Sequence, residues 1–288
     1  MTYKITRKNV AEALNSNERL DGRKLLEQRQ IEISFGVSNK AEGSVRVKMG
    51  KTEVLAGIKM GVQEPYTDHE NEGTMMTSME LLPLASSNFE YGQPSIEAVE
   101  IARVVDRGIR ESRFIDFAKL SIVDGEKVWS VFIDLVTIND DGNLIDASAL
   151  AAILALLAAR FPVYDEKADK IEFGEFTDKK LPLNLENLPL TMTFFKLGEK
   201  IFIDPTGEEE DVTEGRITIE VSKPAGEKSE MINAMQKGGD ATFSVEEVGS
   251  MVEEATKIFK KLKSLVDEEV DKFEKSAEKG AKKKGKKD

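Results

Sequence analysis

Three arginines recur four and then three residues apart in the segment IEAVEIARVVDRGIRES, which spans residues 96–112. At 100° per residue, Arg103, Arg107 and Arg110 fall within about 60° of one another on a helix. The apolar residues of the segment fall on the other side of that helix: Ala98, Ile101, Ala102, Val104, Val105 and Ile109. The spacing predicts an amphipathic helix that buries one face and presents a row of guanidinium groups on the other.

This row has two interpretations. A guanidinium group is planar and donates paired hydrogen bonds, so a row of them is suited to binding the phosphates of a nucleic acid. Alternatively, the face is solvated and its charges pair within the helix. Glu100 precedes Arg103 by three residues, and Asp106 precedes Arg110 by four. Pairs of this kind contribute about 0.3–0.5 kcal/mol each. The residues alone leave both interpretations open.

Other site chemistries find little support in the composition. The chain has no cysteine, so we expect neither disulfides nor thiolate metal sites. Its one histidine, His69, lies in the polar stretch TDHENEG and is expected to be exposed, outside any zinc site or catalytic triad. Acidic residues gather between positions 134 and 146, but the run 140–143 (DDGN) is typical of a turn, and Asp146 is placed to cap the next helix. We therefore expect no metal and no cofactor.

The formal net charge of the 288 residues is −12, and it is unevenly distributed. Residues 275–288 hold seven lysines and two acidic residues, so the rest of the chain carries −17. We expect this lysine-rich tail to be disordered. The acidic body repels nucleic acid at long range, so contact with RNA requires a local basic patch or a partner.

No segment predicts contact with a membrane. The longest apolar run, residues 149–159, is too short to span a bilayer. The first ten residues, MTYKITRKNV, lack the apolar core of a signal peptide. We therefore expect a cytoplasmic protein.

The elements that must position the arginine helix are alternating segments typical of strands. QIEISFGVSN, SVRVKMG and KTEVLAGIKMGV predict an antiparallel meander, and MMTSMELLPLAS predicts a further strand. A hairpin that turns at Asp124-Gly125 precedes a buried, alanine-rich helix at 146–160. Strands and long helices in this order predict an α+β fold.

The pattern restarts after Pro162. Further strands follow, with a second hairpin expected at the Gly-Gly pair of INAMQKGGDATFS. Ser244 and Glu247 form a capping-box sequence at the start of a long helix. We expect two halves, residues 1–165 and residues 166–274 with the long terminal helix, followed by the tail at 275–288.

Five stretches of the sequence resemble RNase PH domains: RLDGRKLLEQR (19–29), GSVRVKMGKTEVLAG (43–57), EIARVVDRGIRES (100–112), VWSVFIDLVTINDDGNLIDASALAA (128–152) and KLPLNLENLPLTMTF (180–194). The pairing of ARVVDRGIRES with LPLNLENLPLT resembles, more narrowly, the catalytically inactive RNase PH-like ring subunits of archaeal exosomes. The resemblance implies the RNase PH-like fold (ribosomal protein S5 domain 2-like), with two similar halves of β-sheet and packed helices. It also implies partners: a catalytic RNase PH-like subunit in a hexameric trimer of heterodimers, S1-domain cap proteins, and single-stranded RNA.

Active relatives are phosphorolytic 3′→5′ exoribonucleases, and the resemblance implies that this chain lacks their active site. Ile96 and Glu97 stand where active subunits have an arginine pair that binds phosphate. The phosphate loop is matched by residues 143–146, NLID, which contain neither a cation nor a hydroxyl. Asp178 and Glu186 are eight residues apart, so they do not match the family's pair of aspartates six apart. We expect no catalytic residue, and no enzyme activity from this chain alone.

The resemblance also gives the arginine row a role. It implies that Arg103 and Arg107 contact the RNA backbone beside the active site of a catalytic neighbour, and that Arg110 either joins them or pairs with Asp106. The expected function is a non-catalytic structural and RNA-binding subunit of the archaeal exosome ring. One alternative is a phosphorolytic 3′→5′ exoribonuclease active as a homo-oligomer, which the missing groups oppose. Another is a free RNA-binding module, which the acidic body opposes.

Overall fold

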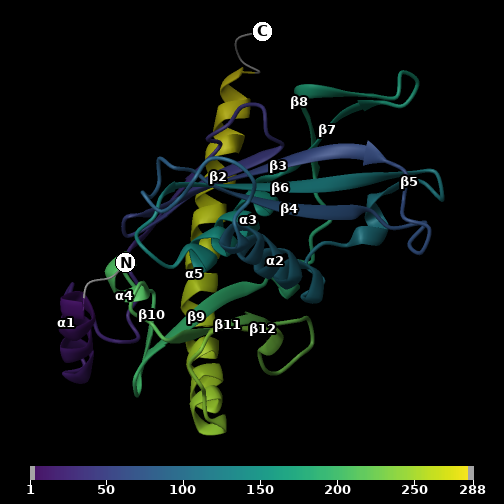
Figure 1. Ribbon diagram of the computed structural model, residues 1–288. Helices are drawn as coiled ribbons and strands as arrows, with labels where there is room; N and C mark the ends of the chain where they lie inside the picture. Colours follow the sequence, from purple (N-terminus) through teal and green to yellow (C-terminus); the bar gives the residue numbers. More distant parts are fainter. Residues whose placement is uncertain (1–3, 285–288) are drawn as a thin grey trace.

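The computed structural model describes residues 4–284, and its fold is α+β, as expected. Two β-sheets lie one above the other in Figure 1, with two helices between them and a third running past both. No helix among the described residues is both long enough and apolar enough to cross a membrane.

The first sheet has the order β1-β2-β3-β6-β4, with β5 paired to β6. Its strands are β1 (Ile31–Phe35), β2 (Gly43–Met49), β3 (Thr52–Gln63), β4 (Thr74–Leu81), β5 (Ser121–Val123) and β6 (Lys127–Asn139). The predicted meander is confirmed: β1, β2 and β3 pair in antiparallel order. The hairpin turning at Asp124-Gly125 is confirmed as well.

Two helices cover the inner face of this sheet: α2 (Ile96–Glu111) packs on β4, and α3 (Leu144–Ala158) packs on β2 and β3. The Oγ of Ser95 caps α2 by accepting a hydrogen bond from the backbone N–H of Ala98 at 3.2 Å. Nearly every side chain of α3 is buried, because sheets flank it on both sides. A short 3₁₀ turn, η1 (Phe117–Leu120), follows α2.

The second sheet is antiparallel, with the order β10-β9-β11-β12. Its strands are β9 (Leu190–Leu197), β10 (Lys200–Ile203), β11 (Gly215–Ser222) and β12 (Met231–Gly239). The ribbon β7 (Arg160–Asp165) and β8 (Lys170–Lys180) and the turn η2 (Leu185–Asn187) connect the two sheets. At the far edge, α1 (Lys4–Asn15) contacts α4 (Gly207–Glu210).

The Gly-Gly hairpin expected in the second half is wrong. Gly238 and Gly239 end strand β12 and pair with Arg216 and Gly215 of β11. A Cβ at Gly238 would press against the guanidinium of Arg216, and Gly239 has a φ of +76°. These glycines therefore allow close approach of two strands, and the β11–β12 turn lies earlier, at residues 223–230.

The long helix α5 (Val245–Lys284) begins with the predicted capping box. The Ser244 backbone N–H donates to Glu247 Oε2 at 2.8 Å, and the Glu247 N–H donates to Ser244 Oγ at 3.1 Å. Its apolar stripe packs on β9 and β11. Farther along, Phe273 stacks on Phe35 of β1, with ring centroids 4.6 Å apart.

The expectation of a disordered tail needs correction over residues 275–284, which continue α5 as helix. Pairs one helical turn apart, such as Lys263 with Asp267 and Lys275 with Asp271, favour the helical conformation in this part of the chain. Residues 285–288 of the expected tail lie outside the described residues. The half boundary at 165 falls within the β7–β8 ribbon and stays a prediction.

Buried ion pairs fasten the segment at 19–29 to the second half. Arg19 pairs with Glu209, and both side chains are almost fully buried. Arg29 binds Asp204, with Nη2 at 2.6 Å from Oδ1, and its backbone N–H donates to Oδ2 at 2.6 Å. Burial raises the pKa of Asp204, but the hydrogen bonds and charge of Arg29 outweigh burial and lower this pKa below its usual value.

The single tryptophan and the single histidine lie in opposite environments. Trp129 is buried in the core and meets the rings of Phe161 and Tyr164 edge-on, at 5.3 and 5.7 Å. His69 is exposed, as its polar surroundings predicted. Neither residue contributes to the arginine helix described next.

Candidate nucleic-acid interface

The predicted amphipathic helix is confirmed in α2. Its buried residues are Ala98, Ile101, Ala102, Val105, Gly108 and Ile109, and the arginines at 103, 107 and 110 are exposed. All three arginines line one groove of about 800 Å³. The walls of this groove come from α2, β4 and the β11–β12 pair, so both halves of the chain contribute to it.

Arg103 lacks the partner that the ion-pair interpretation gave it. Glu100 turns instead toward the second half, where its Oε2 lies 2.8 Å from Nη2 of Arg216. Within residues 4–284, Arg103 forms no hydrogen bond or ion pair. Arg107 is 70% exposed, and its Nε lies 3.9 Å from Glu111, at the outer limit of an ion pair. These two guanidinium groups therefore remain available to bind an anion.

Arg110 is held by its own chain. Its Nε donates to Asp106 Oδ2 at 2.7 Å, which is the i,i+4 pair that the spacing allowed. Its Nη2 donates to the backbone carbonyl of Met75 at 2.6 Å, and its guanidinium lies 5.8 Å from the centroid of the Phe117 ring. Arg110 therefore ties α2 to β4, and it is the member of the row least free to contact RNA.

The groove contains one residue that the sequence did not single out. Glu220 of β11 is only 5% exposed, and burial raises the pKa of its carboxyl to about 8. In the sequence RITIEVS, Glu220 alternates with apolar residues and so resembles the outward-facing position of a half-covered strand. That face is buried here because α2 packs over the β11–β12 pair. The sequence of β11 does not reveal this burial, because the helix that covers the strand, α2, belongs to the other half of the chain.

Residues 143–146, which the resemblance placed at a phosphate loop, are held by contacts within the chain itself. Asp146 is buried, and its carboxylate accepts hydrogen bonds from the Thr193 backbone N–H at 3.0 Å, Thr193 Oγ1 at 2.7 Å and Asn143 Nδ2 at 3.1 Å. Burial raises the pKa of Asp146 to about 6. The expected capping role is wrong, because Asp146 lies within the first turn and Asn143 is the N-cap residue of α3.

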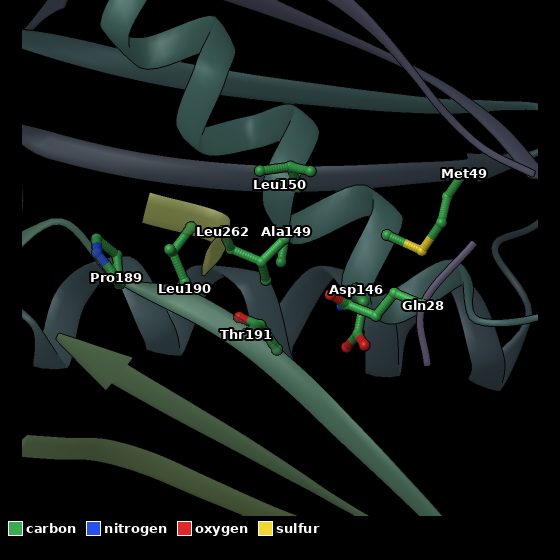
Figure 2. Close-up of a pocket in the computed structure, with 9 residues that line it drawn as sticks. All are labelled: Gln28, Met49, Asp146, Ala149, Leu150, Pro189, Leu190, Thr191 and Leu262. Atoms are coloured by element: carbon green, nitrogen blue, oxygen red, sulfur yellow. The ribbon is translucent and has the colours of Figure 1, made fainter. Parts of the chain in front are cut away.

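Figure 2 shows how little room remains beside Asp146. Asp146 and Gln28 lie at one end of a cavity of about 10 Å³, with Met49 above them and Thr191 of β9 nearby. A volume of this size corresponds to about one water molecule, so a phosphate ion cannot enter. The carboxylate of Asp146 is a built-in anion at the start of α3.

Residues 96 and 97, where the resemblance placed the missing arginine pair, lie at the start of α2. Ile96 is 88% exposed at the start of α2. Desolvation and the charge of Asp140 raise the pKa of Glu97. Burial raises the pKa of Glu210 to about 7, and the charges of Asp140 and Glu97 add to this shift. The charge of Arg216 lowers the pKa of both carboxyl groups and partly offsets these effects. Residues 96 and 97 themselves supply no cation to hold a phosphate.

The remaining acidic candidates do not form a site. Asp178 lies on β8 and Glu186 in η2, and both are exposed. Asp140 accepts a hydrogen bond from the Gly142 N–H at 3.1 Å, which is the turn that the sequence predicted. Within the described residues, no cluster of three or more histidine or acidic side chains is arranged to hold a metal ion.

Comparison with known proteins gives a consistent result. The chain matches both domains of the 3′ exoribonuclease family, RNase PH domain 1 over residues 27–162 and domain 2 over residues 187–258. It is 46% identical over 247 residues to the exosome complex component Rrp42 of Methanothermobacter thermautotrophicus, covering 85% of this chain and 88% of that protein. The Pyrococcus furiosus protein of the same name is 42% identical over 276 residues, covering 95% and 97%.

A solved structure agrees with these sequence relatives. A chain from the Archaeoglobus fulgidus exosome with RNA bound to the active site superposes with a TM-score of 0.80 at 41% identity. The superposition covers 90% of this chain and 97% of that one. The fold expected from the sequence, with two halves of β-sheet and packed helices, is confirmed.

Proposed function

Because this chain belongs to the 3′ exoribonuclease (RNase PH) family, we propose that it is a non-catalytic, RNA-positioning subunit of an archaeal exosome ring. Its relatives at 46% and 42% identity are exosome components, which supports the ring. In this proposal it alternates with a catalytic RNase PH-like subunit as a trimer of heterodimers, and S1-domain proteins cap the ring. The assembly is cytoplasmic and degrades single-stranded RNA with phosphate.

The observation that carries the proposal is the state of the arginine row. Arg103 projects from α2 into a groove of about 800 Å³ and forms no hydrogen bond or ion pair within residues 4–284. Arg107 lines the same groove, and its Nε lies 3.9 Å from Glu111, at the outer limit of an ion pair. Both guanidinium groups are therefore open to an anion, although the chain has a net charge of −12. They bind phosphate oxygens without reading bases, so their role is to hold the strand in register for the neighbour's chemistry.

The proposal that this chain has no catalytic activity of its own rests on the residues at the starts of α2 and α3. Phosphorolysis requires cations to hold inorganic phosphate and groups that stabilise the charge of the leaving phosphate. Here the start of α3 holds the carboxylate of Asp146, and Glu97 and Glu210 surround the place of the missing arginine pair. The positions of these carboxyl groups therefore do not favour the alternative of a phosphorolytic enzyme active as a homo-oligomer.

The decisive experiment compares the purified chain, its catalytic partner and the mixed ring in a phosphate-dependent assay on poly(A). We expect the chain alone to release no nucleoside diphosphate, and the mixed ring to degrade RNA. The mixed ring should also migrate as a single hexameric species. Release of nucleoside diphosphate by the chain alone, at a rate comparable to that of the ring, contradicts the proposal and restores the homo-oligomeric enzyme.

A further inference from the structure

The position of Gly108 within α2 has a steric explanation. A glycine in a helix interior is destabilising relative to alanine. A Cβ at Gly108 would overlap Oε2 of Glu220, which reaches α2 from β11. Because Gly108 has no side chain, the carboxyl group of Glu220 can lie directly against α2.

An irregularity in the second sheet places Glu220 there. The β11–β12 register shifts between Glu220 and Val221, which leaves Asn233 as an extra residue on β12. Glu220 Oε1 and Asn233 Nδ2 are both buried, and neither forms a hydrogen bond of good geometry among the described residues. The side chains of Asn233 and Thr191 nevertheless lie close enough to the carboxyl group to lower its pKa. A buried polar group whose hydrogen bonding is incomplete is destabilising. Exceptions of this kind concentrate at functional sites.

We infer that Glu220 is a positioning residue for the arginine row, an inference that rests on the proposed function. Its carboxyl group meets α2 at Gly108, one residue beyond Arg107, and it lines the same groove as Arg103 and Arg107. The contact sets how closely α2 approaches the β11–β12 pair, and therefore where the two guanidinium groups stand. Small displacements of a positioning group are costly, because the bound strand must stay in register.

The charge state of Glu220 provides an independent readout. Burial raises its pKa to about 8, Asn233 and Thr191 lower it, and the charge of Glu111 raises it. The other charged groups lining the groove all come from α2: Glu100, Arg103, Asp106, Arg107, Arg110 and Glu111. The groove residues of β4, β9 and β12 are uncharged, as is Thr218 of β11. Outside the groove, burial raises the pKa of Glu210 to about 7, so a transition near pH 8 is assigned to Glu220 only if the Glu220→Gln substitution abolishes it.

The first test is a double-mutant cycle in the ring reconstituted with the catalytic partner, with a fluorescently labelled oligoadenylate as the probe. We expect Gly108→Ala to weaken RNA binding about tenfold and to have no further effect when Glu220→Ala has removed the overlap. Gly249→Ala is the matched control, because it adds the same methyl group to α5 where nothing lies within 4 Å. Wild-type affinity in Gly108→Ala, or an equal loss in both backgrounds, overturns the inference.

The second test follows RNA affinity between about pH 7 and pH 9. As the pH rises through about 8, Glu220 loses its proton and places a negative charge beside the bound phosphates. We expect affinity to fall over this window in the wild-type ring and to stay level in the Glu220→Gln ring. Identical pH profiles for the wild-type and Glu220→Gln rings overturn the inference. This test remains valid if Gly108→Ala prevents assembly of the ring.

Arg103→Glu, measured in parallel, separates this inference from the function on which it rests. If Arg103→Glu leaves affinity unchanged, the proposed function fails. If Arg103→Glu weakens binding while the Gly108 and Glu220 variants show neither effect, only the positioning role fails.

Discussion

At the scale of single residues, Arg103 and Arg110 share one face of α2 but differ in what surrounds them. Arg110 donates to Asp106 and to the Met75 carbonyl, whereas Arg103 has no partner within residues 4–284. Two arginines on the same helix face, seven residues apart, thus differ in role: Arg110 is structural and Arg103 is available. Helical periodicity identifies the face, but only the tertiary neighbours determine which guanidinium groups are already bound.

This difference predicts the effect of reversing the charge at position 103. In the mixed ring, Arg103→Glu is expected to lower RNA affinity at least tenfold, because a charged hydrogen bond to phosphate contributes about 1.5–3 kcal/mol. Assembly should be unaffected, since the side chain is exposed. Fluorescence anisotropy and gel filtration measure the two properties. Lys8→Glu on α1, where the side chain is 74% exposed, makes the same charge change elsewhere and should bind RNA normally.

At the scale of elements, the sequence predicted most strands and helices because their apolar periodicity is local. The amphipathic face of α2, the β1–β3 meander and the Ser244 capping box all follow from neighbours close in sequence. Among the features that did not follow, two depend on contacts distant in the sequence. The parallel pairing of β4 with β6 depends on the long connection through α2, and the burial of Glu220 depends on a helix from the other half.

The ion pairs between the segment at 19–29 and the second half give a prediction at the same scale. Asp204→Asn removes the charge that Arg29 and Arg23 face, and it is expected to lower the free energy of unfolding by about 3–5 kcal/mol. Chemical denaturation measures the loss. Asp178→Asn, at an exposed carboxylate, should leave the stability within about 0.5 kcal/mol of wild type.

The same carboxyl group gives the direction of the pH dependence. The pKa of Asp204 is lower in the folded state than its usual value, so its contribution to stability is present above that usual value, near pH 4. The contribution is lost as the pH falls through the folded pKa. Wild-type stability should therefore decrease more steeply on acidification than that of Asp204→Asn. Parallel acid-unfolding curves would contradict this assignment.

At the scale of the whole molecule, the net charge of −12 limits RNA binding to a few sites. For single strands, the slope of log K against log salt concentration is about −0.7 for each phosphate neutralised. Replacing Arg103 and Arg107 together by glutamine should make the slope for the mixed ring less negative by about 1.4. Titrations at several salt concentrations measure it. The pair Lys8→Gln and Lys257→Gln changes net charge equally, and a similar change in slope there would contradict a local contact.

The course of α5 has a consequence for how the protein is made. The helix is about 60 Å long at 1.5 Å per residue. It packs on the second sheet and runs on past the first (Figure 1). Its Phe273 stacks on Phe35 of β1. Because a ribosome synthesises the N-terminus first, β1 cannot form its contact with Phe273 until almost the entire chain has been made. Nascent chains stalled before α5 should accordingly need chaperones, and completion of translation should be the step that releases them.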